Sequence, residues 1–328
     1  MKTTLAAPIR FDLTALRQPT GSRRKIAGMH TSAPLSHSLA ATLGGTWSVL
    51  RLHASGFCAT WRAQQRGDVL FVKSLPLEQR DVLEAEADGL AALAAAGAIR
   101  APSVIRCWRD ADLGETVLAL EWLEFCAPDE GFGRRFGRAL AELHRATPQE
   151  GGGRFGWRRD NMIGATPQRN RWSEGGTSAG WIDFFRRERL EPMRNRLAAH
   201  AQSSALVEAV DSAMAALPAL FADGHVPRAS LIHGDLWSGN WGMLPDGTPV
   251  IYDPAVSCSD HEAELAMMEL FGQPPPGFWN AYADELPLHD GYAHRRDLYQ
   301  LYHLLNHALL FGGGYIRQAT EVARSLVR

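Results

Sequence analysis

Leu231–Asn240 reads LIHGDLWSGN and is followed, after a turn at Pro245–Gly247, by Pro249–Asp253 (PVIYD). The first segment is an apolar lead-in that runs into a polar loop. The second is an apolar run that ends in a carboxylate. The Pro, Asp and Gly between them are turn residues, so the pattern predicts a hairpin whose strands carry polar groups at their ends.

The spacing within the polar loop indicates a chemistry. His233, Asp235 and Asn240 stand at the offsets of the kinase catalytic loop, H-x-D-x-x-x-x-N, and Asp253 follows thirteen residues after Asn240. A kinase needs one carboxylate to receive a hydroxyl proton, and an amide with a second carboxylate to hold Mg²⁺ on ATP. The alternative is a plain β-hairpin with polar turn residues, and the upstream sequence decides between the two.

The upstream sequence contains the expected lysine and its partner. Val69–Lys73 is a β-rich apolar run that ends in Lys, and Leu77–Ala96 is helical by its Ala, Leu and Glu content. Glu84 and Glu86 on this helix are the candidates to pair with Lys73, and we favour Glu86. Such a pair holds a lysine where it reaches ATP phosphates. Both Glu residues would otherwise be solvated, which is the usual fate of helical Glu.

Two further segments are candidates for contacting ATP. A kinase should have a glycine-rich hairpin before the lysine; here only one Gly is in place, and backbone N–H groups would do the binding, at Ser55, Gly56 and Phe57. The strand that begins at Thr116 ends where a kinase hinge would bind adenine through its backbone, at Glu121, Trp122 and Leu123.

Composition limits the class of protein. The chain has 328 residues, 45% of them hydrophobic, and a net charge of −2, which suggests one large or two smaller domains. The near-neutral charge gives no general attraction to nucleic acid or an anionic membrane. No apolar run approaches the length of a membrane span, and the first residues lack the apolar core of a secretory signal. We therefore expect a cytoplasmic monomer or homodimer with no nucleic-acid or membrane partner.

The strongest local departure from the near-neutral charge is the Arg-rich, aromatic-containing stretch Arg154–Trp172. Because the whole chain has no basic excess, RNA contact is disfavoured. We expect instead a loop that meets phosphate or a polar substrate.

The cysteines are Cys58, Cys107, Cys126 and Cys258, and none belongs to a CxxC pair. Neither a zinc site nor a disulfide framework is therefore indicated, and reduced thiols are the default expectation. Cys58 lies in the predicted phosphate loop, where an oxidised thiol would block ATP. The alternative is a small, half-buried residue.

The loop HGDLWSGN (233–240) resembles the fructosamine kinase family, also called ketosamine-3-kinases, because relatives such as aminoglycoside phosphotransferases and choline kinases usually lack its Trp-Ser pair. The resemblance runs from about residue 45 to 325. Two departures are Ser55-Gly56 in place of a Gly-Gly pair and extra sequence around Ser173–Gly180. Four further stretches resemble the same family: Phe155–Trp172, Trp181–Leu190, Asp253–Gly272 and Leu298–Tyr315.

The resemblance implies an α+β, bilobal protein-kinase-like fold. Its small lobe, at residues 41–124, would be an antiparallel β-sheet with one helix, and its larger, mainly α-helical lobe would occupy residues 125–328. Three interpretations fit residues 1–40: a disordered N-terminal arm, a natural start at Met29, or, less favoured, a transit peptide, which the mild basic bias permits.

The resemblance also implies roles for the site residues. ATP would lie between the lobes with Lys73 on its phosphates, and Asp235 would accept the substrate proton while His233 holds the loop by hydrogen bonds. Asn240 and Asp253 would ligate Mg²⁺ through oxygen. Trp237 and His261 would join Asp235 on the substrate side. For Trp237, packing against a sugar and supporting the loop as a core residue are equally open.

The implied substrate is a ketosamine, free or attached to a protein, phosphorylated at its 3-hydroxyl so that the adduct becomes labile and the amine is freed. One rival is a kinase for an aminoglycoside or choline, which the Trp-Ser pair disfavours. Another is a pseudokinase that binds nucleotide without catalysis, which the intact Lys73, Asp235, Asn240 and Asp253 disfavour.

Overall fold

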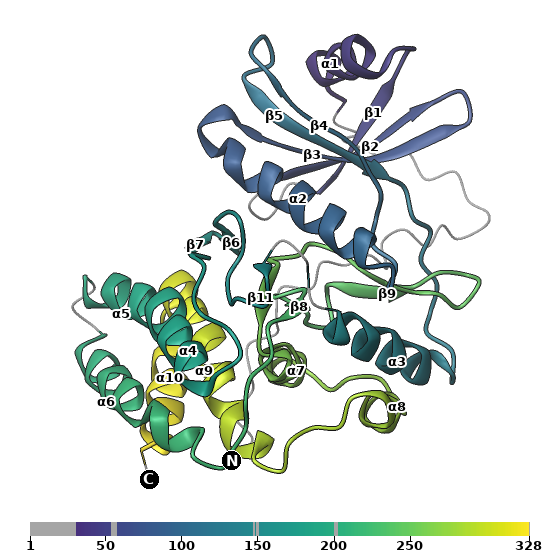
Figure 1. Ribbon diagram of the computed structural model, residues 1–328. Coiled ribbons are helices and arrows are strands. Elements are labelled where there is room, and N and C mark those ends of the chain that lie inside the picture. The colour runs from purple at the N-terminus through teal and green to yellow at the C-terminus, as the bar shows by residue number, and fades with distance from the viewer. Residues whose placement is uncertain (1–30, 54–57, 147, 149–150, 200–202, 328) are drawn as a thin grey trace, which may run out of the picture.

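The computed structural model describes residues 31–53, 58–146, 148, 151–199 and 203–327, which form a small and a large lobe (Figure 1). The small lobe is an antiparallel sheet of strand order β1-β2-β3-β5-β4, and the large lobe is mainly helical, which confirms the predicted α+β class. The small-lobe elements are α1 (Ala33–Leu43), β1 (Ser48–His53), β2 (Ala59–Gln65), β3 (Asp68–Pro76), α2 (Arg80–Ala96), β4 (Val104–Asp110) and β5 (Glu115–Glu121).

Side chains alternate between the two faces of the small sheet, and both faces are buried. On β3, Leu70 and Val72 face a core that α1 covers, whereas Leu75 belongs to a second core that includes Leu83 and Leu90 of α2. Lys73 has the parity of Leu75, so period-2 geometry directs its side chain toward α2. The position of this lysine therefore follows from the strand register.

Helix α1 corrects the expected lobe boundary. The sequence predicts that residues 33–40 belong to an N-terminal arm and that the small lobe begins at 41 and has one helix. Instead the Ser32 side chain accepts the Leu35 N–H at 3.3 Å and starts a helix that buries Leu35 and Leu39 completely. Only two large apolar residues mark this face in an Ala- and Ser-rich segment, so its helical pattern is weak. The prediction for residues 1–30 falls outside the described residues.

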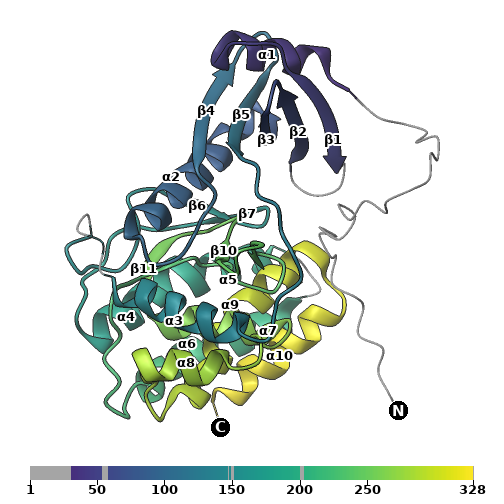
Figure 2. The same cartoon turned by 90° about the vertical axis from the view of Figure 1, so that its right-hand side faces the viewer.

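The large lobe surrounds a short set of strands with helices (Figure 2). Strand β8 pairs with β11, β9 with β10, and β6 with β7, each pair antiparallel. The elements are α3 (Phe132–Arg145), β6 (Asn161–Ile163), β7 (Thr166–Gln168), α4 (Ser178–Phe184), the π-helical segment η4 (Phe185–Leu190), α5 (Glu191–Ala198), α6 (Ser204–Leu220), β8 (Ser230–Ile232), β9 (Trp241–Met243), β10 (Pro249–Ile251), β11 (Ser257–Ser259), α7 (His261–Leu270), α8 (Phe278–Glu285), α9 (Tyr292–Phe311) and α10 (Gly314–Ser325).

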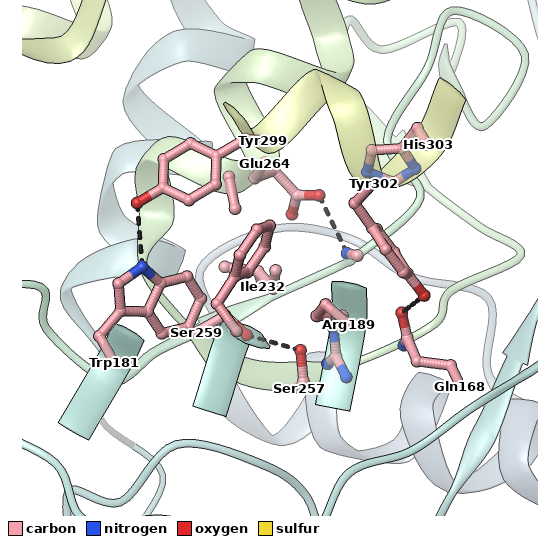
Figure 3. A pocket seen from close by; sticks show the side chains of 13 residues that line it. Gln168, Trp181, Arg189, Ile232, Ser257, Ser259, Glu264, Tyr299, Tyr302 and His303 are labelled. Atoms are coloured by element: carbon pink, nitrogen blue, oxygen red, sulfur yellow. Dashed lines mark hydrogen bonds between the residues drawn. The ribbon is translucent and has the colours of Figure 1, made fainter. Parts of the chain in front are cut away.

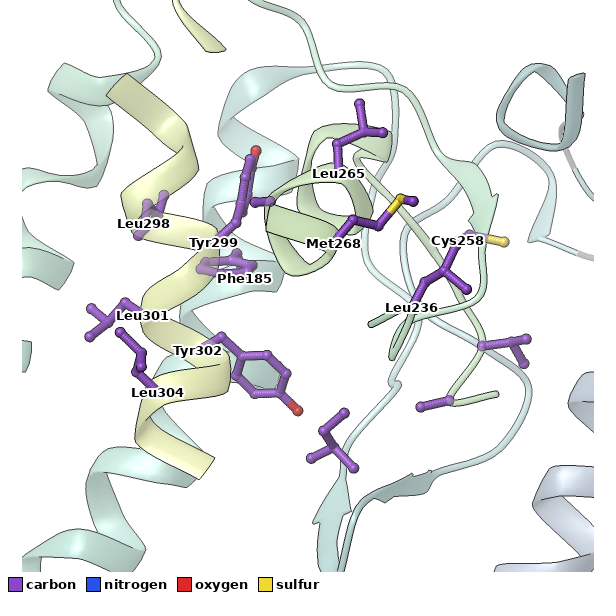
Figure 4. Packing of buried hydrophobic residues seen from close by; sticks show 14 of the residues in the cluster. Phe185, Leu236, Cys258, Leu265, Met268, Leu298, Tyr299, Leu301, Tyr302 and Leu304 are labelled. Atoms are coloured by element: carbon purple, nitrogen blue, oxygen red, sulfur yellow. The ribbon is translucent and has the colours of Figure 1, made fainter. Parts of the chain in front are cut away.

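Helix α9 is the centre of the large-lobe core. Leu301 and Leu304 point to one side of it, and Tyr299 and Tyr302 to the other, toward α7 and β11 (Figure 4). Because nearly every position from Leu298 to Asn306 is buried, α9 is packed on all sides. The strands beneath the small lobe therefore rest on a rigid support.

The two lobes are linked by the segment between β5 and α3, which runs down one edge of the molecule (Figure 1). A backbone contact adds to this link, because the Ile251 N–H donates to the Arg100 carbonyl at 2.9 Å. In the described part of the chain, no helix combines the length and the apolar character that crossing a bilayer requires.

Candidate active site between the lobes

Lys73 joins the two lobes through its ammonium group. Its Nζ lies 2.7 Å from Glu86 Oε1 of α2 and 2.6 Å from Asp253 Oδ1 of the large lobe. Burial lowers the pKa of Lys73, but Asp253 and Glu86 outweigh that effect and raise the pKa above its usual value. The lysine is therefore fully charged at neutral pH and is fixed at the top of the interlobe site.

The structure decides between the two glutamates. Glu84 accepts hydrogen bonds from Arg109 of β4 at 2.6 and 2.8 Å, so it is held on the other side of α2. Residues two apart on a helix point in nearly opposite directions, and only one of this pair can face the sheet lysine. The predicted Lys73–Glu86 pair is thus confirmed as a contact.

The predicted turn at Pro245–Gly247 closes a hairpin of β9 and β10, whereas the apolar lead-in forms β8 and pairs with β11. The loop before β9 is bound by internal hydrogen bonds. The His233 Nε2–H donates to the Tyr252 carbonyl at 2.8 Å, and His233 Nδ1 accepts the Asp235 N–H at 3.2 Å. Burial lowers the pKa of His233, so the ring is neutral, with a proton only on Nε2. The Asn240 amide nitrogen donates to the Asp235 carbonyl at 2.8 Å. His233 and Asn240 therefore hold the loop from both ends.

Gly234 is required by the shape of this loop. Its φ is +85°, and a Cβ at this position would lie 2.1 Å from the Ala255 carbonyl oxygen. The close approach of these two backbones brings Asp235 next to the segment that follows Asp253.

Asp253 carries the strained backbone of the site. Its φ of +60° is the one positive value among described residues other than glycine. Such conformations are stored at functional positions where neighbours over-determine them. Here one carboxylate oxygen is fixed by Lys73, and the side chain is 41% exposed.

The donor set of Asn240 and Asp253 fits Mg²⁺. The Asn240 amide nitrogen points at the Asp235 carbonyl, which turns its oxygen away from that partner. One Asp253 oxygen is on Lys73, and the Asp253 side chain as a whole stays partly exposed. Hard oxygen ligands from one carboxylate and one amide are what Mg²⁺ uses when phosphate and water complete its shell.

Asp235 lies in an electrostatically strained position. Burial, together with the negative charges of Asp253 and Glu264, raises the pKa of Asp235 well above its ordinary value, while the Asn240 hydrogen bond lowers it. A carboxylate that is destabilised in this way accepts a proton more readily than a solvated one.

Glu264 is a residue that the sequence analysis gave no role. It is buried in α7, and its carboxylate accepts the His233 N–H at 2.5 Å and the Gly234 N–H at 2.9 Å. It thus anchors the loop that carries Asp235. No motif spacing links these positions. The available signal was an acidic residue in the first turn of a helix, which is common for reasons of the helix dipole alone.

The two other residues predicted on the substrate side have different surroundings. Trp237 is half-buried, and its indole covers Gly239, where an added Cβ would lie 2.3 Å from the ring. His261 is buried against Asp260 and its ring lies 6.1 Å from that of His144, whose Nε2 is 3.6 Å from Glu264. His261 is thus buried among residues that support the loop, and its role on the substrate side stays a prediction.

The predicted ATP-contact segments are only partly described. Ser55, Gly56 and Phe57 fall outside the described residues. Glu121 ends β5 and accepts the Ser103 N–H at 2.6 Å, and the Trp122 indole N–H donates to Glu124 at 2.6 Å. Glu121, Trp122 and Leu123 thus form the start of the interlobe link, where the hinge was expected.

Cys58 is half-buried at the edge of the phosphate-loop region. Burial raises the pKa of its thiol to about 11, although the nearby Lys73 opposes this effect. The thiol is therefore protonated at neutral pH, which is a poorly reactive form.

A small cavity of about 20 Å³ lies behind the loop, large enough for one water molecule (Figure 3). Its wall includes Gly234 and Glu264, and His303 and Tyr302 of α9 close it from the other side. Tyr302 donates to Gln168 Oε1 at 2.8 Å, and the Gln168 amide donates to the Ala255 carbonyl at 3.2 Å. The cavity is thus part of the polar support of the site.

Acid is expected to unfold this core because His303 is buried uncharged. Burial lowers the pKa of His303 from 6.5 to about 3. The unfolded chain therefore binds this proton first, so the stability that His303 gives is complete above about pH 6.5 and is lost as the pH falls toward the folded value. In urea titrations over this range, His303→Gln should reduce the slope of unfolding free energy against pH. Exposed His37→Gln is the control, and equal slopes in wild type and His303→Gln would contradict the prediction.

The chain is similar in sequence and in structure to known proteins of one family. A family model described as fructosamine kinase matches residues 40–328. A probable ketoamine kinase from Synechocystis is 42% identical over 261 residues, which cover 79% of this chain and 83% of the relative. A chloroplastic protein-ribulosamine 3-kinase from Oryza sativa subsp. indica is 36% identical over 259 residues, covering 79% and 72%. A crystal structure assigned to a fructosamine-3-kinase from Thermobifida fusca has a TM-score of 0.77 and 31% identity, covering 90% of this chain and 98% of that one.

Proposed function

This protein belongs to the fructosamine kinase family, and we propose that it transfers the γ-phosphoryl group of ATP to the 3-hydroxyl of a ketosamine. The observation that carries the proposal is the chain of contacts from Glu86 through Lys73 to Asp253. It stands beside a loop that presents Asp235 and Asn240. A pseudokinase would have no need to retain this complete set.

The chemistry follows from the placement of these groups. Lys73 binds the phosphates of ATP, and the carboxylate of Glu86 keeps its ammonium group in place. Asn240 and Asp253 would hold Mg²⁺, which when bound would neutralise the charge of the phosphates. Asp235 accepts the proton of the substrate hydroxyl as that oxygen attacks the γ-phosphorus. Because the transition state is loose, most of the acceleration comes from positioning and charge neutralisation.

Trp237 is our candidate for contact with the sugar part of the substrate. Its indole is half-buried two residues after Asp235 and rests on Gly239. An aromatic face supplies apolar area beside polar groups, which suits a sugar ring. The relatives named for ketoamine and protein-ribulosamine support a substrate that is a small ketosamine or a glycated protein. Phosphorylation at the 3-hydroxyl would make the adduct labile, so we assign the enzyme to deglycation in the cytoplasm.

A substrate panel tests the proposal. The purified protein, with ATP and Mg²⁺, would be offered ribulosamine, erythrulosamine and fructosamine forms of lysine, together with choline and kanamycin. We expect ADP release with ketosamines only, and phosphorus NMR of the product should locate the phosphate on the 3-hydroxyl. Phosphorylation of choline or kanamycin without any ketosamine would overturn the proposal, as would nucleotide binding without turnover of any acceptor.

A further inference from the structure

The Arg-rich stretch that begins at Arg154 has a different use from the one its sequence indicated. We expected it to meet phosphate or a polar substrate. Instead Arg158 and Arg159, which precede β6, form ion pairs with carboxylates on α2 of the small lobe. A segment of the large lobe therefore contacts the helix that carries Glu86.

Asp88 of α2 is the centre of this contact. Its Oδ2 accepts the Trp157 indole N–H at 2.7 Å, and its Oδ1 accepts the Arg158 Nε–H at 2.7 Å, with a second, shorter bond from the same guanidinium. The Asp88 side chain is only 12% exposed, although Arg158 is 43% exposed. Two donors and low exposure make this a more directional contact than an ordinary surface ion pair.

The contact acts on the opposite side of α2 from the lysine. Glu84 and Asp88 are four residues apart and share one side of the helix, where Arg159 lies 3.4 Å from Glu84. Glu86 is two residues from each, so it points nearly the opposite way, toward Lys73. The helix is thus held from both sides, and this arrangement fixes its rotation.

A third contact limits the distance of α2 from the large lobe. A Cβ at Gly89 would lie 3.2 Å from side-chain carbons of both Pro254 and Val256, the residues that follow Asp253. The absence of a side chain at Gly89 lets the helix rest directly on this segment. Translation of α2 away from Asp253 would therefore break packing as well as the Asp88 contact.

The segment that holds Asp88 is itself anchored in the large lobe. Gly156 and Cys258 of β11 exchange two backbone hydrogen bonds, at 2.8 and 3.0 Å, and the ring of Phe155 packs 4.9 Å from that of Trp181. The Asn161 amide donates to the Val256 carbonyl at 2.8 Å. The anchor is thus continuous with the backbone that carries Asp253.

The Asp88 contact lies on the side of the molecule away from the covalent link between the lobes. The link between β5 and α3 runs down one edge, whereas β6 and β7 lie below α2 away from that edge (Figures 1 and 2). The lobes are therefore joined on both flanks, by the chain on one and by Asp88 on the other.

We propose that Asp88, held by Trp157 and Arg158, is a positioning residue that fixes the rotation of α2 and so keeps Glu86 on Lys73. It touches neither substrate and acts through the lysine. The proposal rests on the use of Lys73 for ATP given under the proposed function. It makes nucleotide binding depend on a contact between the lobes.

A double-mutant cycle tests this proposal. Affinity for a non-hydrolysable ATP analogue with Mg²⁺ would be measured by calorimetry for wild type, Asp88→Ala, Glu86→Gln and the double variant. We expect Asp88→Ala to weaken binding about tenfold in the wild-type background and less than about twofold when Glu86 is already replaced. The KM for ATP should rise while the KM for the ketosamine stays within about twofold.

Two further variants separate positioning from a general loss of structure. Asp211→Ala removes an ion pair with Arg194 of similar length, 2.6 and 2.9 Å, between α5 and α6, and should leave nucleotide affinity unchanged. Asp88→Asn keeps an acceptor for Trp157 but loses the charge, so its affinity should lie between wild type and Asp88→Ala. If Asp88→Ala fails to fold, Arg158→Gln replaces it in the cycle.

The proposal is overturned by equal losses in both Glu86 backgrounds, by no loss at Asp88, or by the same loss in Asp211→Ala. Because the affinity cycle needs no acceptor, a wild-type protein that binds nucleotide but phosphorylates no ketosamine would sink the proposed function without affecting this test.

Discussion

Asp235→Asn is expected to lower kcat by about 10²- to 10⁴-fold, the usual contribution of a positioned general base. Asparagine has nearly the same shape but cannot accept the hydroxyl proton in the transition state. Lys73, Asn240 and Asp253 remain in place, so the affinity for ATP should stay close to that of the wild type. The measurement is steady-state turnover of a ketosamine, with nucleotide affinity determined separately by calorimetry.

The matched control for this variant is Asp246→Asn. Asp246 lies on the exposed turn between β9 and β10, in the hairpin that follows the Asp235 loop, and its carboxylate accepts the Thr248 N–H at 2.9 Å. The Asp246→Asn variant should retain wild-type turnover. If Asp235→Asn also kept its turnover, Asp235 would not be the base, and another group would have to receive the proton.

Glu264→Ala is expected to destabilise the protein by about 2–5 kcal/mol, because it leaves the backbone N–H groups of His233 and Gly234 buried without an acceptor. Turnover should also fall, at temperatures where the variant is still folded, because the loop that carries Asp235 loses its anchor. Urea unfolding gives the stability, and kcat measured well below the thermal midpoint gives the effect on positioning.

Two variants sharpen the interpretation at Glu264. Glu264→Gln has one carbonyl oxygen to accept an N–H but presents its NH₂ group to the other N–H. Its loss of stability should therefore be smaller than that of Glu264→Ala. Glu285→Ala removes an exposed carboxylate of α8 that is 3.5 Å from Arg145 and should change stability little. A Glu264→Ala variant as stable and as active as wild type would show that water replaces the carboxylate without cost.

The features that sequence predicted well are those with a local pattern. The loop from His233 to Asn240 is short, and a single loop fixes the sequence separations of its polar residues. Spacing alone therefore identifies it. The hairpin before Asp253 follows from turn residues between two apolar runs. Lys73 and Glu86 lie on a strand and on the helix that follows it, so chain connectivity already placed them near each other.

The features that sequence did not predict depend on contacts between distant segments. Helix α1 carries too few large apolar residues to show its period, and its burial depends on a sheet that forms later in the chain. The burial of His261 against Asp260 was not predicted either, because its surroundings depend on how α7 leaves β11. A motif gives the distance along the chain, and this distance says nothing about the direction in which a helix starts.

The sequence by itself determined the fold class, the catalytic loop and the lysine with its glutamate, because each is written in residues close along the chain or in adjacent elements. Only the tertiary structure decided that Glu264 anchors the loop and that Asp88 is held by the Arg-rich segment. The physical reason is that the role of each carboxylate depends on which hydrogen-bond donors contact it. Those donors come from segments 30 to 70 residues away, within the large lobe for Glu264 and across the two lobes for Asp88.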